Sequence, residues 1–479
     1  MIRESWLNVV AIMLDSLRPD HIGCYGNEWI KTPNIDRLAS EGTIFERAYA
    51  EGLPTIPVRT ALFTGKYTLP LRGWQRLEPT DNVMAEILWD KGYTSALISD
   101  TYHMHKPRMG FCRGFDFVEW IRGQECDPFV VDPAVEVDLS RHHRKNYAVR
   151  QYPNLEPEET KRMFVQYLKN TAHWRDEEDH FVAQVVKASI KWLETLASRG
   201  KGDRVFLWVD SFDPHEPWDP PPPYDEMYAV PGYEGLPITW AGGFAGDFTL
   251  EEIRHVRAQY AGEVTMVDRW VGLLLERMDE LGLMDNTLIV LLSDHGEPLG
   301  EHGIIKKVRP WPYEELSRIP LIVRHPDGIG KDKRVRGFVH TPDVMATILD
   351  FLGIRVPDGL YAKSLLPLMT GEEEGLHDRA VSGHHGLSWS IRDETWSLYL
   401  WLGPQAKYTW GLVEERPLME RARPELYRID RGFVPPRPAG YDPERDMAER
   451  ENLIDKEPEV AAALELELRR FMDRLKWQG

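Results

Sequence analysis

The segment at residues 7–14, Leu-Asn-Val-Val-Ala-Ile-Met-Leu, decides the fold that we expect. It is a short, nearly continuous apolar run that ends at Asp15, which is typical of a strand buried on both faces of a parallel sheet. Similar runs follow at residues 96–99, 205–210, 287–294 and 320–324. Helical patterns separate them at residues 57–64, 83–91, 158–198, 250–281 and 342–352. This alternation predicts an α/β fold with a doubly wound, mostly parallel sheet.

The composition changes near residue 370, where a charged Gly-Glu-Glu-Glu-Gly stretch at residues 371–375 ends the alternation. We therefore expect a large α/β domain at residues 1–370 and a smaller α+β domain at residues 371–479. The smaller domain should hold antiparallel strands at residues 389–391, 396–401 and 426–429 and a closing amphipathic helix at residues 457–477. Segments 217–223 and 403–420 are expected to be surface loops.

The chain carries 58 Lys and Arg against 77 Asp and Glu residues, a net charge of −19 at pH 7. So acidic a chain argues against a nucleic-acid partner, because such binding requires Lys and Arg to neutralise phosphates. The three cysteines, Cys24, Cys112 and Cys126, form no C-x-x-C pair and favour a reducing compartment. No long apolar run and no signal-peptide pattern is visible, so we expect a cytoplasmic protein without a membrane partner.

Acidic residues stand at or just after the ends of three predicted strands: Asp15, Asp210 and Asp294. In doubly wound sheets the ligand lies outside the carboxyl ends of the strands, so these carboxylates should meet at one edge. His295 follows Asp294 in a Gly-rich loop, and the pair supplies two metal ligands where the backbone bends freely. The alternative is that His295 merely caps the strand end.

A second segment, residues 55–65, has the features of a helix N-terminus. Thr55 occupies the expected N-cap position, with Pro57 in the first turn and Arg59 beside the positive end of the helix, where an anion can bind. A capping threonine is often only a cap. His215 is a further strand-end residue, and the convergence of all these side chains in one fold predicts a catalytic site.

These segments resemble the sulfatase branch of the alkaline phosphatase superfamily, whose signature is Cys/Ser-x-Pro-x-Arg-x-x-Leu-x-Thr-Gly. The matching positions are Thr55, Pro57, Arg59, Leu62, Thr64 and Gly65. Further matches lie at residues 32–39, at His215-x-Pro217, and at residues 293–297, 319–322 and 426–427. The resemblance implies the same α/β fold over the length of the chain.

The departures from that pattern bear on function. Sulfatases convert the first signature residue to formylglycine, whereas Thr55 is a secondary alcohol that cannot become that aldehyde. Asp15 is followed by Ser16 where the family tends to have a second Asp, and the family's Lys-x-His is replaced by residues 101–103, which keep only His103. If Thr55 replaces a natural Cys or Ser, the natural protein is expected to use the sulfatase chemistry.

The remaining set resembles the single-metal site of phosphoryl-transfer members that use a Thr nucleophile, such as lipoteichoic acid synthases and phosphoethanolamine transferases. It is also similar to the phosphonate monoester hydrolase/phosphodiesterase group, in which the spacing from Asp-His to a lysine places that lysine at Lys307. The resemblance implies one divalent metal ion held by Asp15, Asp294, His295 and Thr55. Imidazole with carboxylates favours Mn²⁺ or Zn²⁺, and Ca²⁺ stays open.

We therefore expect a hydrolase of phosphate or phosphonate esters that acts on small anionic substrates. Thr55 would be the nucleophile, Arg59 and Lys307 would offset charge on the equatorial oxygens, and His215, or else His103, would protonate the leaving group. Two alternatives are a sulfate ester hydrolase and a non-catalytic anion-binding protein. A homo-oligomer is an open alternative to a monomer.

Other side chains receive weaker expectations. His105 could bind substrate. His302 could be a hydrogen-bonding partner of the metal site or, equally, a simple loop histidine. Residues 118–124 could line a substrate pocket, although an aromatic residue such as Trp120 more often only packs against its neighbours. The pairs His142-His143 and His384-His385 lack a strand-end context and are expected in loops or on the surface.

Overall fold

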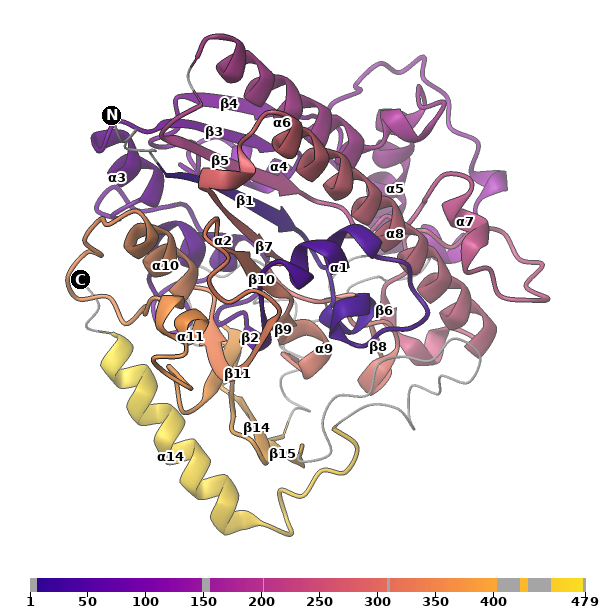
Figure 1. Cartoon of the computed structure of the whole chain (residues 1–479). Helices are drawn as coiled ribbons and strands as arrows, with labels where there is room; N and C mark the ends of the chain where they lie inside the picture. Colours follow the sequence, from indigo (N-terminus) through magenta and orange to yellow (C-terminus); the bar gives the residue numbers. More distant parts are fainter. Residues whose placement is uncertain are drawn as a thin grey trace.

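A computed structural model describes residues 7–148, 156–200, 202–307, 311–402, 423–429 and 449–476. Its main feature is a nine-stranded, mostly parallel sheet with the order β11-β2-β10-β7-β1-β5-β3-β4 and β9 paired to β2 (Figure 1). The strands are β1 (Asn8–Leu14), β2 (Thr43–Tyr49), β3 (Thr94–Ser99), β4 (Phe117–Trp120), β5 (Val205–Ser211), β7 (Thr287–Leu292), β9 (Arg318–Ile319), β10 (Leu321–Arg324) and β11 (Lys333–His340). The predicted fold class is confirmed.

Strand β1 lies at the centre of this sheet, parallel to β5 on one side and to β7 on the other. All residues of β1, β5 and β7 are buried, because helices cover both faces. Alternate side chains of β1 enter two different cores: Val10 and Ile12 pack in one, and Val9 and Ala11 pack in the other. The continuous apolar run in the sequence therefore reflects burial on two faces.

The helices form two layers. The first core includes side chains from α1, α6 and α8, and the second includes side chains from α2, α3 and α10, so the sheet is sandwiched between these groups (Figure 1). The helices are α1 (Pro33–Ser40), α2 (Thr55–Thr64), α3 (Met84–Asp90), α4 (Tyr102–His105), α5 (Pro157–Thr171), α6 (Phe181–Ser198), α7 (Tyr224–Met227), α8 (Leu250–Glu280), α9 (Glu314–Ser317), α10 (Asp343–Phe351), α11 (Leu366–Thr370) and α14 (Pro458–Leu475).

Several elements differ from the sequence prediction. The helix expected at residues 158–198 is two helices, α5 and α6, because Asp176 and Asp179 accept hydrogen bonds from nearby backbone N–H groups and turn the chain between them. The strand expected at residues 320–324 is β10, which pairs antiparallel with β7 and β2. Strands β2, β4 and β11 were not predicted, and the charged residues of β11 fit its position at the sheet edge.

The C-terminal part holds an antiparallel sheet, as expected, but with four strands where three were predicted. Its strands are β12 (Ala380–His384), β13 (Ser388–Arg392), β14 (Trp396–Trp401) and β15 (Glu425–Arg428). Helix α14 packs Leu464 and Leu468 against this sheet in one core, which agrees with its predicted apolar face. The domain boundary after residue 370 stays a prediction.

The two expected loops have different outcomes. Residues 217–223 form a loop, but Trp218 in it is fully buried, so it is not simply a surface segment. Residues 403–420 lie outside the described residues. A small two-stranded sheet, β6 (Gly243–Phe244) with β8 (Ile304–Ile305), pairs the chain before α8 with the loop that follows β7. Among the helices in the described ranges, none combines the length and the apolar character that a membrane crossing requires.

Candidate active site

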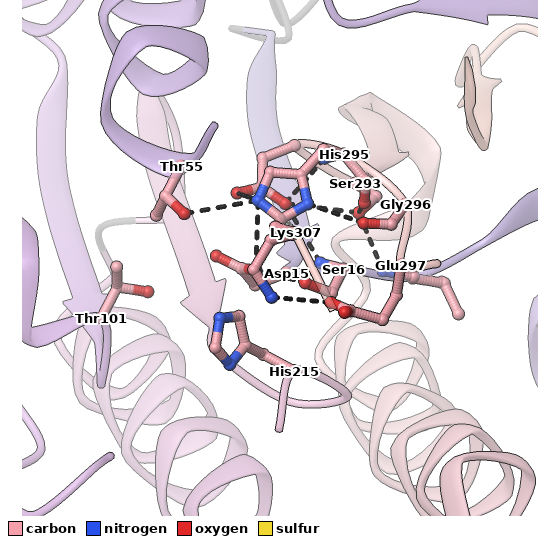
Figure 2. A network of polar contacts seen from close by, with 12 residues as sticks. Asp15, Ser16, Thr55, Thr101, His215, Ser293, His295, Gly296, Glu297 and Lys307 are labelled. Carbon is pink, nitrogen blue, oxygen red and sulfur yellow. Dashed lines mark hydrogen bonds and ion pairs between the residues drawn. The ribbon is translucent and has the colours of Figure 1, made fainter. Parts of the chain in front are cut away.

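The predicted site residues converge at the carboxyl edge of the sheet. Asp15 follows β1, Asp294 and His295 follow β7, and Thr55 begins α2, so three distant parts of the sequence meet at one place (Figure 2). Asp15, Asp294 and His295 are fully buried, and Thr55 is 3% exposed. The convergence that the strand ends predicted is therefore present in the structure.

Asp15, Asp294 and His295 have the arrangement of metal ligands. Their candidate donor atoms all lie within 4.8 Å of one another. Asp15 Oδ2 is buried and accepts no hydrogen bond from the described residues, although Arg59 Nη2 lies 3.1 Å away. Burial, followed by repulsion from Asp294, raises the pKa of Asp15 well above its usual value. A divalent cation would relieve this crowding, so the residues present fit the metal that the resemblance implies.

The protonation of His295 also suits a metal ligand. Its Nδ1 lies 2.8 Å from the Gly296 carbonyl oxygen, which accepts only from a protonated nitrogen, so Nε2 carries the lone pair. That Nε2 faces Asp294 Oδ2 at 3.4 Å and Asp15 Oδ1 at 3.9 Å. Burial lowers the pKa of His295 to about 4, so the ring is neutral at pH 7.

Ser16 takes part in the site although the family pattern has a carboxylate there. Its hydroxyl donates to Asp15 Oδ1 at 2.9 Å and its backbone N–H donates to Asp294 Oδ1 at 3.1 Å. Ser16 has a φ of 61°, and this turn brings both groups toward the two carboxylates. The single carboxylate at this strand end is therefore oriented by its neighbour.

Thr55 is the first residue of α2, and Pro54 occupies the cap position, so the predicted N-cap role is wrong. Its hydroxyl lies 3.3 Å from His295 Nε2 and makes no capping hydrogen bond to the helix backbone. The side chain points toward the candidate metal ligands (Figure 2). A hydroxyl at the positive end of a helix and beside a metal site is well placed to act as a nucleophile.

Arg59 contacts the carboxylates that surround Thr55. Its Nη1 donates to Asp294 Oδ2 at 2.7 Å, and its Nη2 donates to Asp210 Oδ1 at 2.6 Å. Asp210 also accepts a hydrogen bond from the Thr101 hydroxyl at 2.7 Å. This fully buried guanidinium is thus fixed by protein partners, and it holds the carboxylates of Asp210 and Asp294 in place.

Lys307 lies in the site but is not alone there. Its Nζ is 2.7 Å from Glu216 Oε2 and 2.6 Å from Glu297 Oε2. The neighbouring Lys306 Nζ is 2.7 Å from Glu216 Oε1. Sequence analysis missed both glutamates and Lys306, because Glu216 is 91 residues from Lys307 and no local pattern marks the pair.

His215 has a different protonation from the one expected. Its Nδ1 lies 2.7 Å from the Glu216 carbonyl oxygen, which identifies Nδ1 as the donor and leaves Nε2 as an acceptor. Burial, then Lys307 and Lys306, lowers the pKa of His215 well below its usual value. The ring is neutral at pH 7, so it is suited to accept a proton, and its role as the acid that protonates the leaving group stays a prediction.

His103 and His105 lie beyond the metal ligands. His103 Nε2 contacts Glu125 Oε2 at 3.2 Å, and its ring packs edge-on against Trp74. Burial lowers the pKa of His103 and also lowers that of His105 to about 4. His105 stacks on Trp120 with ring centroids 5.1 Å apart. Trp120 therefore has the packing role that was one of its two alternatives.

The other expected residues are placed elsewhere. Arg122 pairs with Asp127, and buried Gln124 bridges Asp100 and Asp213 through its side-chain amide. The expectation of loop or surface positions is wrong for His384, which is the buried last residue of β12. The other three histidines of these pairs, His142, His143 and His385, are partly exposed.

Of the two alternatives for His302, the structure supports the loop histidine, because its ring nitrogens contact Glu315 and Glu449 and not the candidate metal ligands. Its Nδ1 contacts Glu315 Oε1 at 2.8 Å and its Nε2 contacts the Glu449 carbonyl oxygen at 3.0 Å, so it ties the loop after β7 to the C-terminal part. Burial alone would lower its pKa, but the facing carboxylate of Glu315 outweighs this and raises the pKa to about 9.

This raised pKa predicts a pH-dependent stability. Because the folded-state pKa of His302 exceeds its unfolded value of about 6.5, the stabilisation is complete below about pH 6.5 and is lost as the pH rises toward 9. We expect a loss of roughly 3 kcal/mol in the free energy of unfolding, measured by urea denaturation across this range. His302→Gln should remove most of this pH-dependent loss. The control His173→Gln, which changes an exposed histidine, should leave the loss unchanged. An unchanged pH dependence in His302→Gln would contradict the assignment.

Comparison with known proteins agrees with this geometry. The family model described as Sulfatase matches residues 7–354, which is most of the chain and includes every residue placed in the site above. The chain belongs to the sulfatase family. Members of the family hydrolyse ester bonds, act on small ester substrates and use a divalent metal ion, so this sulfatase-family protein is an ester hydrolase.

Individual relatives carry names of both chemistries. An arylsulfatase of Clostridium perfringens is 26% identical over 94% of this chain and 90% of its own length. The multifunctional alkaline phosphatase superfamily protein PehA of Trinickia caryophylli is 29% identical over 76% of this chain and 77% of its own length. The crystal structure of a phosphonate monoester hydrolase of Agrobacterium radiobacter superposes with a TM-score of 0.72 at 21% identity, covering 97% of this chain and 96% of that one. That similarity shows the shared fold.

Proposed function

We propose that this sulfatase-family protein hydrolyses phosphate diesters or phosphonate monoesters through Thr55. The observation that carries the proposal is the threonine hydroxyl itself, placed 3.3 Å from His295 Nε2 where the family's signature has a residue that becomes formylglycine. A threonine cannot supply the hydrated aldehyde through which sulfatases release sulfate. It can form and release a phosphoryl ester, because hydrolysis at phosphorus does not need that aldehyde.

The proposed reaction has two steps. In the first, Thr55 Oγ1 forms a bond to phosphorus, the bond from phosphorus to the leaving oxygen breaks, and the hydroxyl proton of Thr55 ends on that oxygen. In the second, water attacks the phospho-threonine, the bond from phosphorus to Oγ1 breaks, and Oγ1 regains a proton. Neutral His215, with its acceptor Nε2, is suited to take a proton from the attacking water.

A divalent cation held by Asp15, Asp294, His295 and Thr55 would supply charge stabilisation and lower the pKa of the hydroxyl. Mn²⁺ and Zn²⁺ suit a site of imidazole and carboxylates, and Ca²⁺ is the third candidate. Arg59 and the N-terminus of α2 lie where positive potential offsets charge on the reacting group. Lys307, in the loop after β7, lies close to Asp15 and His295 (Figure 2).

A second candidate is sulfate ester hydrolysis, which the names of the curated relatives favour. It would require a sulfo-threonine that water must then cleave at sulfur. We rank it second because Thr55 offers no aldehyde hydrate whose elimination would expel sulfate.

Parallel turnover assays separate the candidates. Mn²⁺-loaded protein is given an aryl phosphodiester, an aryl phosphonate monoester, an aryl phosphomonoester and an aryl sulfate, and kcat/KM is measured for each. We expect the phosphodiester or the phosphonate monoester to have the highest value. A higher value for the aryl sulfate would overturn the proposal in favour of the second candidate.

A further inference from the structure

Four buried charged side chains lie on the loops that carry His215 and His295: Glu216, Glu297, Lys306 and Lys307. None is more than 6% exposed. Glu216 places one carboxylate oxygen 2.7 Å from each lysine Nζ, and Glu297 lies 2.6 Å from Lys307 Nζ. Both lysines are therefore paired with carboxylates.

This cluster borders the place where the ester would bind. Glu216 directly follows His215 in the chain, and its Oε2 lies 3.3 Å from His215 Nδ1. Lys307 influences the protonation of His215, His295 and Asp15 alike, which places its charge among the site residues. Figure 2 shows Lys307 and His215 close to Asp15 and His295.

The carboxylates around the site are at least as many as its cations, because a carboxylate oxygen of Glu125 also lies within 4.8 Å of one of Glu216. Two lysines face two glutamates, and Arg59 faces Asp210. A divalent cation would face Asp15 and Asp294. Burial lowers the pKa of Lys306 well below its usual value, so Lys306 adds at most one positive charge. The site as a whole has no excess positive charge.

Such a balance discriminates between anions by their charge. A tetrahedral ester with one negative charge can be stabilised by local donors and the cation. A second negative charge on the ester would lie near Glu216 and Glu297 without a further cation, and like charges repel strongly in a buried site. Tetrahedral phosphodiesters, phosphonate monoesters and sulfate monoesters all carry one charge, whereas a phosphate monoester carries two.

We propose that Glu216 is a specificity-determining residue, which restricts the site to singly charged esters by neutralising Lys306 and Lys307. The inference rests on the proposed function only in that a tetrahedral anionic ester binds beside Thr55. It holds for an ester of phosphorus or of sulfur. It assigns Glu216 no contact with the reacting atoms.

The test compares two ligands of the same shape and different charge. Phenyl sulfate carries one negative charge, and phenyl phosphate carries two at pH 8. Both are titrated by calorimetry into Mn²⁺-loaded Thr55→Ala protein, which lacks the proposed nucleophile, so that binding is measured without turnover. The measured quantity is the ratio of the two dissociation constants.

We expect phenyl sulfate to bind more tightly than phenyl phosphate in the Thr55→Ala protein. Adding Glu216→Gln should shift the ratio toward phenyl phosphate by at least about tenfold, because it removes one negative charge within a few ångströms of the ligand. The matched control is Glu301→Gln, a buried carboxylate on the same loop as Lys307 that pairs with Arg18 and Arg257. It should leave the ratio unchanged.

An unchanged ratio in folded Glu216→Gln protein overturns the inference, as does an equal shift in Glu301→Gln. If Glu216→Gln does not fold, Glu297→Gln removes the other carboxylate from Lys307, and an unchanged ratio there overturns the inference instead. Metal content measured on each variant confirms that the cation is still bound. Failure of the proposed function would be seen separately, as the absence of phosphorus ester turnover by protein that retains Thr55.

Discussion

Thr55→Ala is expected to lower turnover of the best phosphorus ester by about 10⁴-fold or more, since it removes the proposed nucleophile. The fold should be unaffected, because the Thr55 hydroxyl makes no capping hydrogen bond to α2. The measurement is kcat under saturating Mn²⁺ and substrate, with thermal melting as the check on folding.

The matched control for this variant is Thr60→Ala, which removes another buried threonine hydroxyl from the same helix. It should keep turnover within a small factor of the unaltered protein. Acid quenching during turnover should also trap phosphate on a peptide that contains Thr55, visible by mass spectrometry. If Thr55→Ala retains its rate, the nucleophile is a different group, and both the mechanism and the ranking of phosphorus over sulfur are lost.

The second large effect concerns the metal. Asp294→Asn is expected to weaken binding of Mn²⁺ or Zn²⁺ by at least about 100-fold, because it removes a charged ligand while keeping the size of the side chain. Turnover should fall with it. The measurement is the metal content of dialysed protein together with a titration of the metal-free protein.

The control for Asp294→Asn is Asp268→Asn, a buried carboxylate that accepts hydrogen bonds from the backbone at the start of α1 and lies outside the site. The Asp268→Asn protein should still bind one metal ion per chain, with the same affinity as the unaltered protein. One tightly bound ion in the Asp294→Asn protein would place the metal elsewhere, for instance at the group formed by His340, Asp343 and His377.

The local sequence was enough to predict the central strands and their ends. Apolar runs without alternation indicated burial on both faces, and Asp15, Asp210 and Asp294 then had to meet at one edge, because parallel strands carry their carboxyl ends to the same side. Strand β11 was missed because its lysines and arginines are those of an edge strand, which has no long apolar run. The break between α5 and α6 was missed because both sides of it are helical in pattern.

The sequence by itself determined the kinds of side chains at the candidate site: a threonine, an Asp-His pair and an arginine, each at the end of a strand or in the first turns of a helix. Only the tertiary structure decided how these groups are paired. Glu216 meets Lys306 and Lys307, and His302 meets Glu449. Glu216 and Lys307 are 91 residues apart in the sequence, and His302 and Glu449 are 147 residues apart. Such contacts depend on how loops from different strands pack together, so no periodicity or motif records them, and they set the protonation states and the charge balance on which the chemistry depends.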